Sequence, residues 1–364
     1  MAPIKRIGIL TGGGDCPGLN AVIRGVAKAA MHTYGIQVFG FYDAFRGLVS
    51  GAGKWLEWDD VSGILTLGGT ILGTTNRDNP FAYTDDHRHP ERTRDASPDI
   101  VANYRKLKLD ALVAVGGDGT LKCSHKMSKL GLKVVGVPKT IDNDVRGTDL
   151  TFGFNTAVTT ATEAADKLHT TAASHHRVML LEVMGRTAGW LALTAGIAGG
   201  GDVILLPEIP YRLEAICAKL RERERRGKHF SIIVVSEGAR PVGGSVVVRE
   251  RVADSYEQVR LGGVSVVLSK QIEELSGFET RYTILGHLQR GGTPTAFDRL
   301  LATQFATAAV ELTVSGRFNR MVCLRGGRIS SVSLAVAGKA PRLVPPRSPV
   351  IRVARLVGTS FGDA

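Results

Sequence analysis

Cysteine is scarce in this sequence, and long apolar runs are missing. The four cysteines lie far apart, form no CxxC pair and have no histidine at zinc spacing, which argues against a disulfide framework or a structural metal site. No run approaches the roughly 18 apolar residues of a membrane span. The apolar stretch after Lys5 and Arg6 is too short for a signal peptide. We therefore expect a soluble, cytoplasmic protein with reduced thiols.

Aromatic residues are also few, at 6% of the chain, and they do not alternate with the basic residues. A net charge of +12 would suit nucleic acid or an anionic membrane. The lysines and arginines, however, are spread along the chain without a helix-turn-helix pattern, which argues against nucleic acid. Anionic small substrates explain the basicity, and we expect neither nucleic acid nor membrane as a partner.

Short β-branched runs alternate with longer amphipathic stretches. The strands that we predict are 7–10, 37–42, 111–115, 134–137, 178–183, 203–206, 230–236 and 281–285, and the helices are 19–33, 101–108, 121–130, 154–172 and 211–226. Apolar strands without alternation are typical of a parallel sheet covered on both faces, so the pattern predicts an α/β fold. We expect two similar lobes with mainly parallel sheets flanked by helices, and an active site in the cleft between them.

Two segments lack this periodicity. Residues 77–99 carry Arg, Asp, His and Pro, and we predict a surface loop there. Residues 341–364 hold four prolines among basic residues, which predicts an extended tail with low helix potential.

Glycine, by contrast, is abundant, and its clusters follow predicted strands, where ligands bind on α/β sheets. The segment Thr11–Asn20 contains three consecutive glycines before a helix, and their N–H groups and the helix dipole favour a phosphate. A tight turn without a ligand is the alternative. Asn20 and Arg24 in the first helical turns favour phosphate binding.

Gly116–Thr120 places one carboxylate, Asp118, among residues without bulk, at a strand end and a helix start. A carboxylate there would repel a phosphate unless a divalent cation lay between them, so the motif implies Mg²⁺. The structural alternative is that Asp118 caps the helix.

Thr140–Asp144 is the sharpest signal. In an extended loop, residues two apart point the same way, so Asp142 and Asp144 would face the same site. A hydroxyl that attacks phosphorus needs a base within hydrogen-bond reach, and a positioned aspartate can take the proton late. Asn-Asp is also a turn dipeptide, but a turn does not explain a cluster that follows Pro138 and Lys139.

Four arginines are placed at the ends of apolar runs, at positions 177, 186, 281 and 290. Because guanidinium groups match phosphate oxygens, the four together suggest a phosphate pocket. His287 is a candidate hydrogen-bond donor to a substrate.

Taken in order, these segments resemble the phosphofructokinase family from about residue 4 to about residue 334. The resemblance rests on residues 11–20, 68–73, 116–120, 138–144, 174–177, 182–190, 237–238 and 285–293. It implies Mg²⁺-dependent transfer of a phosphoryl group to the 1-hydroxyl of fructose 6-phosphate, giving fructose 1,6-bisphosphate in glycolysis.

By matching position, the resemblance implies that Asp142 is the proton acceptor and that Asp118 is the carboxylate linked to Mg²⁺. The implied catalytic residues are Asp142, Arg186, Thr140, Gly119 and Lys139. The implied ATP-binding residues are Gly13, Arg77, Gly117, Asp118, Gly119 and Thr120. The implied sugar-phosphate residues are Thr140, Asp142, Asp144, Arg177, Met184, Gly185, Arg186, Glu237, Arg281, His287 and Arg290.

The resemblance also implies an organisation. Residues 1–153 plus about 291–340 would form a larger lobe that binds ATP and Mg²⁺, and residues 154–290 a smaller lobe that binds the sugar phosphate. Residues 341–364 would be a Pro-rich basic tail in place of the family's final helix. In this family Arg177 and Arg281 reach in from a neighbouring subunit, so we expect a homodimer or homotetramer, in which allosteric regulation would be possible.

The phosphoryl donor is read from two positions. Position 119 is Gly, as in ATP users of the family, whereas pyrophosphate users carry Asp there, which would repel the nucleotide's α-phosphate. Position 139 is Lys, which pyrophosphate users share, but an extra cation is tolerable beside a triphosphate. We predict ATP as the donor, with pyrophosphate as the alternative.

Two other classes of function remain open. An NAD kinase or lipid kinase would share Gly116–Thr120, but not the segments 138–144 and 285–290. A non-catalytic paralogue would be expected to have lost Asp118, Asp142, Arg186 or Arg290, and all four are present.

Overall fold

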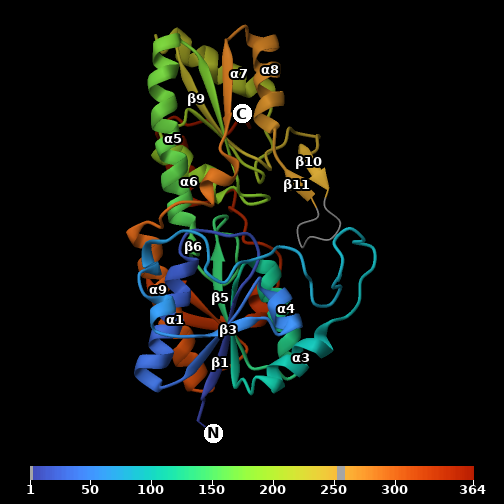
Figure 1. Ribbon diagram of the computed structural model, residues 1–364. Coiled ribbons are helices and arrows are strands. Elements are labelled where there is room, and N and C mark those ends of the chain that lie inside the picture. The colour runs from blue at the N-terminus through green and yellow to red at the C-terminus, as the bar shows by residue number, and fades with distance from the viewer. Residues whose placement is uncertain (1–2, 252–258) are drawn as a thin grey trace. The chain divides into compact units, whose positions relative to one another are not determined.

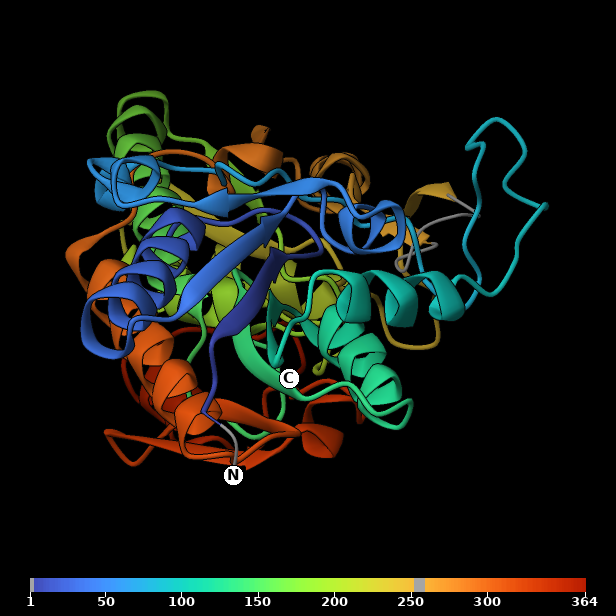
Figure 2. The ribbon, with the colours of Figure 1, turned by 60° about the horizontal axis from the view of Figure 1, so that its bottom comes forward.

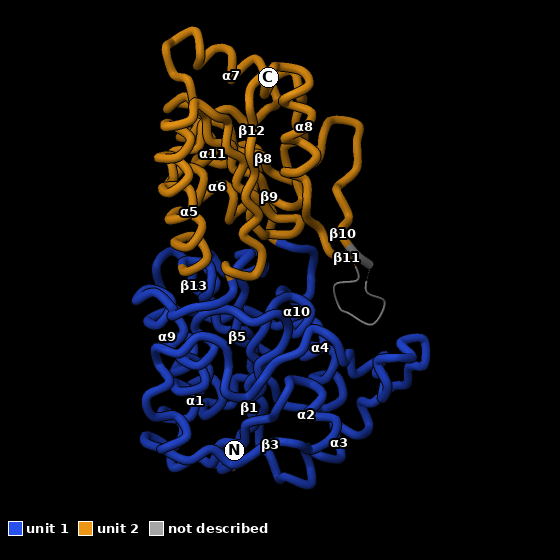
Figure 3. The backbone as a smooth tube through the Cα atoms, turned by 45° about the horizontal axis from the view of Figure 1, so that its top comes forward, with its two compact units in different colours: residues 1–155, 252–258, 290–341 blue, residues 156–251, 259–289, 342–364 orange. Residues whose placement is uncertain are grey.

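The computed structural model describes residues 3–251 and 259–364, which divide into two units (Figures 1 and 3). Unit 1 holds the described residues 3–155 and 290–341. Unit 2 holds residues 156–251, 259–289 and 342–364. Among the described residues, we find no helix whose length and apolar character would suffice to cross a bilayer.

Unit 1 is built on one large sheet. Its strands are β1 (Arg6–Thr11), β2 (Gln37–Phe41), β3 (Gly53–Leu56), β4 (Ala111–Gly116), β5 (Val134–Thr140), β6 (Phe152–Gly153), β13 (Arg320–Arg325) and β14 (Arg328–Ser333). Their order is β14-β13-β5-β4-β1-β2-β3, with β6 paired to β5. The inner pairs are parallel, and β3 and β14 join the two edges antiparallel. The carboxyl ends of β1, β4 and β5 therefore lie at one edge of the sheet.

Helices cover both faces of this sheet. They are α1 (Leu19–Tyr34), α2 (Phe45–Ser50), α3 (Ser97–Lys106), α4 (Asp118–Ser128), α9 (Ala296–Val314) and α10 (Leu334–Ala337), with short 3₁₀ turns η1 (Asp59–Val61) and η2 (Ile64–Thr66). Helices α1 and α9 pack together on one side, and α3 and α4 lie on the other (Figure 2). The first pair is close, because a Cβ on Gly25 would lie 2.6 Å from the Cβ of Ala306.

Unit 2 has a smaller sheet with only parallel pairs. Its strands are β7 (Val178–Val183), β8 (Val203–Leu205), β9 (Ser231–Ser236) and β12 (Thr280–Ile284), in the order β12-β7-β9-β8. An antiparallel hairpin pairs β10 (Val248–Arg251) with β11 (Val259–Leu261). The helices are α5 (Phe154–His175), which begins at the end of unit 1, then α6 (Trp190–Ala198), α7 (Leu213–Arg225), α8 (Val264–Ser276) and α11 (Pro349–Leu356), with the turn η3 (Gly286–Gln289).

The core of unit 2 explains why its strands are apolar throughout. Side chains from α7 and α8, such as Ile216 and Leu268, pack on Leu180 and Ile233 of one face. On the other face Gly196 of α6 lies close against Ile204. Both faces are covered, so alternation of polar and apolar residues is not needed.

Every predicted strand and helix overlaps one in the structure, but several elements were not predicted. Among these are β3, β6, the hairpin β10–β11, β13, β14, α6, α8 and α9. Between residue 77 and the start of α3 at Ser97 the chain forms turns and one isolated bridge, Tyr83 to Arg94.

The expectation of an extended, non-helical C-terminal tail is wrong. Pro349 starts α11, and the side chain of Ser348 accepts a hydrogen bond from the N–H of Val350. A proline at the first helical position loses no hydrogen bond, so Ser-Pro here is a helix start and not a helix breaker. After α11 the chain pairs with β8 through Ser360, and Phe361 is fully buried.

Candidate active site

In unit 1 the Gly-rich loop after β1 is held by hydrogen bonds to two other segments, the end of β4 and residues 74–75. The N–H of Gly12 donates to the carbonyl of Val115 at 2.9 Å, and the N–H of Gly13 donates to the carbonyl of Thr75 at 3.0 Å. Thr74 donates from its hydroxyl to the carbonyl of Gly13 at 2.7 Å. The loop is thus fixed against the end of β4 and against the segment that leads to Arg77.

Two buried or half-buried cations reach the same loop. Lys139, at the end of β5, donates from Nζ to the carbonyl of Gly14. Arg290 donates from Nη1 to the carbonyl of Asp15 at 3.0 Å. A Cβ on Gly14 would lie 2.6 Å from Arg290 Nη1, so a larger residue at position 14 would make this guanidinium group shift. The structure therefore brings Gly13, Lys139 and Arg290, which are far apart in the sequence, around one loop.

Thr120 belongs to the same group. It is buried in the first turn of α4, and its Oγ1 would be 3.6 Å from a Cβ on Gly13. Asp118 is the first residue of α4, and the N-cap position before it is Gly117. Asp118 therefore lies in the first turn of α4, where a carboxylate is favoured by the helix dipole.

Asp142 is a buried carboxylate just after the end of β5. It is only 4% exposed, and its N–H donates to Thr140 Oγ1 at 3.1 Å. No group among the described residues donates a hydrogen bond to Asp142 Oδ1. A buried carboxylate oxygen without a donor is costly unless a ligand supplies one.

The reason given above for pairing Asp142 with Asp144 is wrong. Asn143 between them has φ 53°, in the left-handed region, so the loop is not extended and alternation does not apply. Asn143 Oδ1 accepts from the N–H of Thr151 at 3.1 Å, which fixes this turn. Both aspartates are nevertheless buried.

Asn20 has a structural role that the sequence did not reveal. Its side-chain amide donates to the carbonyls of Leu67 and Gly68 at 3.2 and 3.1 Å, and its Oδ1 accepts from the N–H of Ile71 at 2.8 Å. Asn20 therefore holds the 67–71 loop, and it no longer supports phosphate binding by α1.

Cys16 lies in the same Gly-rich loop but is not a nucleophile. Burial raises the pKa of the Cys16 thiol to about 12. Since the thiolate is the reactive form, the side chain stays neutral at physiological pH. All four cysteines are free, as their spacing predicted, and all four are buried.

In unit 2, Glu237 holds the turn that carries Arg186. Arg186 has φ 54°, unusual for a residue with a side chain, and its N–H donates to Glu237 Oε1 at 2.9 Å. Gly185 before it has φ 137°, and a Cβ on Gly238 would collide with the carbonyl of Arg186. These contacts place Met184, Gly185, Arg186 and Glu237 together at the carboxyl ends of β7 and β9.

Glu182, in β7, is hydrogen-bonded to the segment after β12 and to the start of α8. Its carbonyl accepts from the N–H of Leu285 at 3.1 Å, and its buried carboxylate accepts from the N–H groups of Gly263 and Ser265 at 2.7 and 2.9 Å. His287 follows in η3, so it begins from the same edge as Arg186. Glu182 was not singled out from the sequence, since a glutamate inside an apolar strand gives no sign of its partners.

Arg177 and Arg281 are not at this edge. Arg177 comes immediately before β7 and Arg281 is the second residue of β12, paired in register with Met179. The six residues of β7 span about 20 Å, so these two arginines and Arg186 lie at opposite edges of the sheet of unit 2. The prediction that all four arginines follow strand ends is wrong for this pair.

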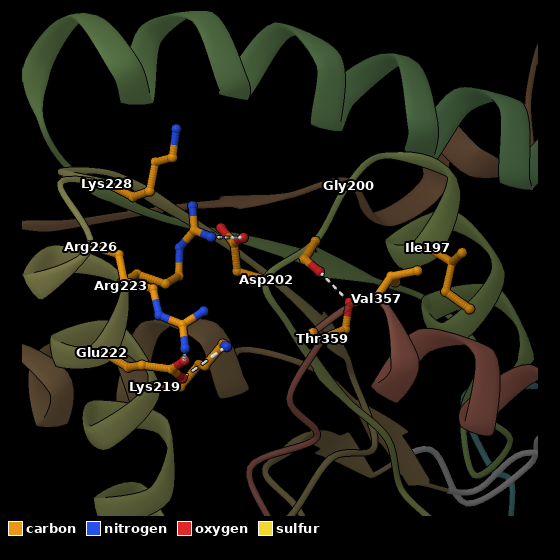
Figure 4. Close-up of a pocket in the computed structure, with 12 residues that line it drawn as sticks. Ile197, Gly200, Asp202, Lys219, Glu222, Arg223, Arg226, Lys228, Val357 and Thr359 are labelled. Carbon is orange, nitrogen blue, oxygen red and sulfur yellow. Dashed lines mark hydrogen bonds and ion pairs between the residues drawn. The ribbon is translucent and has the colours of Figure 1, made fainter.

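A separate pocket of about 350 Å³ lies elsewhere in unit 2. Its wall carries four basic and two acidic side chains, and Val357–Thr359 close one side (Figure 4). Asp202 pairs with Arg223 at 2.7 Å, while burial raises the pKa of Asp202. No predicted site residue lines it, and its members are too scattered in the sequence to have been grouped.

The family of the chain follows from sequence comparison. A family model described as Phosphofructokinase matches residues 6–313. The chain belongs to the phosphofructokinase family. This match spans β1, the loops after β4 and β5, and both edges of the unit 2 sheet.

Individual phosphofructokinase relatives match over the full length. The chain is 52% identical over 365 residues to the ATP-dependent 6-phosphofructokinase 2 of Clostridium perfringens, with 100% of both chains covered. It is 51% identical to the ATP-dependent 6-phosphofructokinase of Spirochaeta thermophila, with 99% of this chain and 98% of the relative covered.

The solved structure of phosphofructokinase from Saccharomyces cerevisiae matches with a TM-score of 0.77 and 32% sequence identity. The match covers 92% of this chain but only 45% of the yeast chain. The α/β architecture with two mainly parallel sheets, predicted from the sequence, is confirmed.

Proposed function

We propose that this chain transfers a phosphoryl group from ATP to the 1-hydroxyl of fructose 6-phosphate, giving ADP and fructose 1,6-bisphosphate. Two full-length relatives at 52% and 51% identity are named for this activity. The structural observation that carries the proposal is Asp142, a buried carboxylate whose Oδ1 accepts no hydrogen bond from the described residues. A sugar hydroxyl would supply the missing donor.

Asp142 then acts as the general base. The 1-hydroxyl oxygen forms a bond to the terminal phosphorus of ATP, the bond from that phosphorus to the bridging oxygen breaks, and ADP leaves. The hydroxyl proton passes to Asp142, late in a transfer that is loose and in-line. Thr140, the last residue of β5, and Asp144, in the loop that follows, are also assigned to the sugar phosphate.

The donor would lie over the Gly-rich edge of unit 1. Gly13, Arg77, Gly117, Gly119 and Thr120 are assigned to ATP by their match to the family, and the glycines at the strand ends leave room for its phosphates. The N–H of Gly13 already donates to Thr75, so Gly13 would contribute space and not a hydrogen bond. Lys139 is the cation that offsets charge on the transferring group. The names of the relatives favour ATP over pyrophosphate as the donor.

Mg²⁺ fits this edge only as a partner of the nucleotide. Among the residues that the structure describes, no three His, Cys, Asp or Glu side chains gather as a metal-binding group. Mg²⁺ is typically held by one or two carboxylates with phosphates and water, and Asp118 offers such a carboxylate. When bound, the ion would neutralise charge on the phosphates.

The residues assigned to the sugar phosphate belong to both units. Unit 1 carries Thr140, Asp142, Asp144 and Arg290, and unit 2 carries Met184, Gly185, Arg186, Glu237 and His287. Met184, Gly185 and Arg186 form the turn held by Glu237, and His287 begins from the same edge. On this assignment, unit 1 is the ATP-binding lobe and unit 2 the sugar-phosphate lobe. We also propose that the protein is cytoplasmic.

The active form is proposed to be a homodimer or homotetramer. Arg177 and Arg281 start from the sheet edge opposite Arg186, so one chain would not use both edges for one substrate. Their placement is what a contribution to a neighbouring copy's site requires.

A coupled assay tests the proposal. Purified protein with Mg²⁺ should convert fructose 6-phosphate only when ATP is the donor. Parallel reactions check the alternatives, with pyrophosphate in place of ATP as the donor, and with NAD or diacylglycerol in place of fructose 6-phosphate as the acceptor. Turnover with pyrophosphate and none with ATP would contradict the donor assignment. No turnover of fructose 6-phosphate with either donor would contradict the function.

A further inference from the structure

Glu279 binds both arginines of the far sheet edge at once. Its Oε1 lies 2.8 Å from Arg177 Nη2 and 2.7 Å from Arg281 Nη2. Its backbone is fixed as well, because its carbonyl accepts from the N–H of Val178 at 3.0 Å. The two guanidinium groups therefore converge on one anionic oxygen at the start of the β7–β12 pair.

This geometry is that of a phosphate oxygen between two arginines. The hydrogen bond from Arg177 lowers the pKa of the Glu279 carboxyl, so it is ionised at neutral pH and keeps its place. Glu273 adds a second carboxylate, 3.8 Å from Arg281 Nη1. Two acidic groups thus face two basic ones, and the positive charge of the arginines is offset before any substrate arrives.

We propose that Glu279 occupies the phosphate place between Arg177 and Arg281, and that the phosphate of a sugar phosphate must displace it. The inference rests on the proposed function, in which these arginines serve the site of a second copy of this chain. Before the ligand binds, Glu279 holds the two guanidinium groups, so it competes with the ligand for them.

The competition is weak enough to be reversible. The side chains of Arg281 and Glu279 are 52% and 45% exposed, and ion pairs so exposed are held loosely and screened by salt. A phosphate carries more charge and more acceptor oxygens than a carboxylate, so it displaces Glu279 from both arginines.

Replacing Glu279 by glutamine tests the proposal, because the side chain keeps its size and loses its charge. The Glu279→Gln enzyme should show a KM for fructose 6-phosphate about two- to fivefold lower, as expected for an exposed pair, with the KM for ATP and kcat nearly unchanged. The matched control is Glu274→Gln, an exposed glutamate on α8, which should leave all three constants as in the wild type.

A KM for fructose 6-phosphate that is unchanged or raised in Glu279→Gln would overturn the proposal. If that variant does not fold, Glu279→Asp replaces it, since its shorter carboxylate cannot reach both arginines and should also lower the KM. A wild-type protein without activity on fructose 6-phosphate would refute the proposed function and this inference with it. An active wild type with no effect at Glu279 refutes the inference alone.

Discussion

At the scale of single residues, the proposed site includes a carboxylate and a lysine that are both buried at the end of β5. Asp142 and Lys139 lie in one short segment and are 4% and 3% exposed. Lys139 is turned to the Gly-rich loop, whereas Asp142 Oδ1 accepts nothing from the described residues. The segment therefore offers a buried carboxylate oxygen that could accept a hydrogen bond from a bound substrate.

Asp142→Asn should lower kcat about 10²- to 10⁴-fold, the usual cost of losing a general base, and change the KM for fructose 6-phosphate much less. The amide keeps the shape of the side chain but cannot take the hydroxyl proton. Steady-state kinetics with a circular dichroism control measure this, and near-normal turnover in a folded variant would remove Asp142 from its role.

Gly119→Asp should abolish the use of ATP and, because Lys139 is already in place, reveal some activity with pyrophosphate. The new carboxylate would occupy the space of the α-phosphate and repel it. Asp is favourable in the first turn of a helix, so α4 should still form. Gly119→Asn is the matched control, since it adds similar bulk without charge. Retained ATP turnover in Gly119→Asp would show that position 119 does not select the donor.

At the scale of elements, the fold of unit 2 depends on the turns after β7 and β9 and on the segment that follows α11. The turn at Gly185 and Arg186 is held by Glu237, which directly follows the neighbouring strand β9, and the last segment of the chain pairs with β8 through Ser360. After α11, Thr359 donates to the carbonyl of Gly201 at 3.1 Å, and the N–H of Ser360 to that of Asp202 at 3.0 Å. The C-terminal segment is thus part of the fold of unit 2.

Phe361→Ala should destabilise unit 2 by about 3–5 kcal/mol, because a fully buried aromatic side chain leaves a cavity. Leu356→Ala on α11 is the control, since Leu356 is 74% exposed and should change stability by less than about 0.5 kcal/mol. Urea unfolding of both variants measures the difference. Equal midpoints would mean that the C-terminal segment does not stabilise the unit.

At the scale of the whole molecule, the two groups of arginines support the proposal that each site draws on more than one chain. Arg186 begins from one edge of the unit 2 sheet, and Arg177 and Arg281 from the other. A substrate phosphate is far smaller than the strand length of about 20 Å that separates them. Closed assemblies of identical chains satisfy such an arrangement, because each copy both gives and receives.

Mixing inactive Asp142→Ala and Arg177→Ala subunits should restore activity. In a dimer, random pairing makes half of the molecules mixed, with one of their two sites intact, so about a quarter of the wild-type activity should return. The control mixes Asp142→Ala subunits with subunits that carry both Asp142→Ala and Arg177→Ala. This mixture can form no intact site, because no subunit keeps Asp142. No recovery in the test mixture, or a fully active monomer in sedimentation, would contradict the shared site.

What the sequence determined by itself was local. Apolar runs with no alternation predicted the buried parallel strands β4 and β5, and the glycines and aspartates after them predicted Asp118 and Asp142 as site residues. These features depend on neighbours within a few residues, so spacing and composition are sufficient evidence. The start of α11 was equally local, but Ser348 and Pro349 were interpreted as tail and not as cap.

What only the tertiary structure decided was which groups meet. Asn20 bonds a loop about fifty residues away, and Arg177 and Arg281 share Glu279 because β7 and β12 pair in register. Such contacts depend on strand order and on which end of a strand a residue occupies. Neither is encoded in local spacing, because pairing between distant segments is set by the packing of the whole sheet.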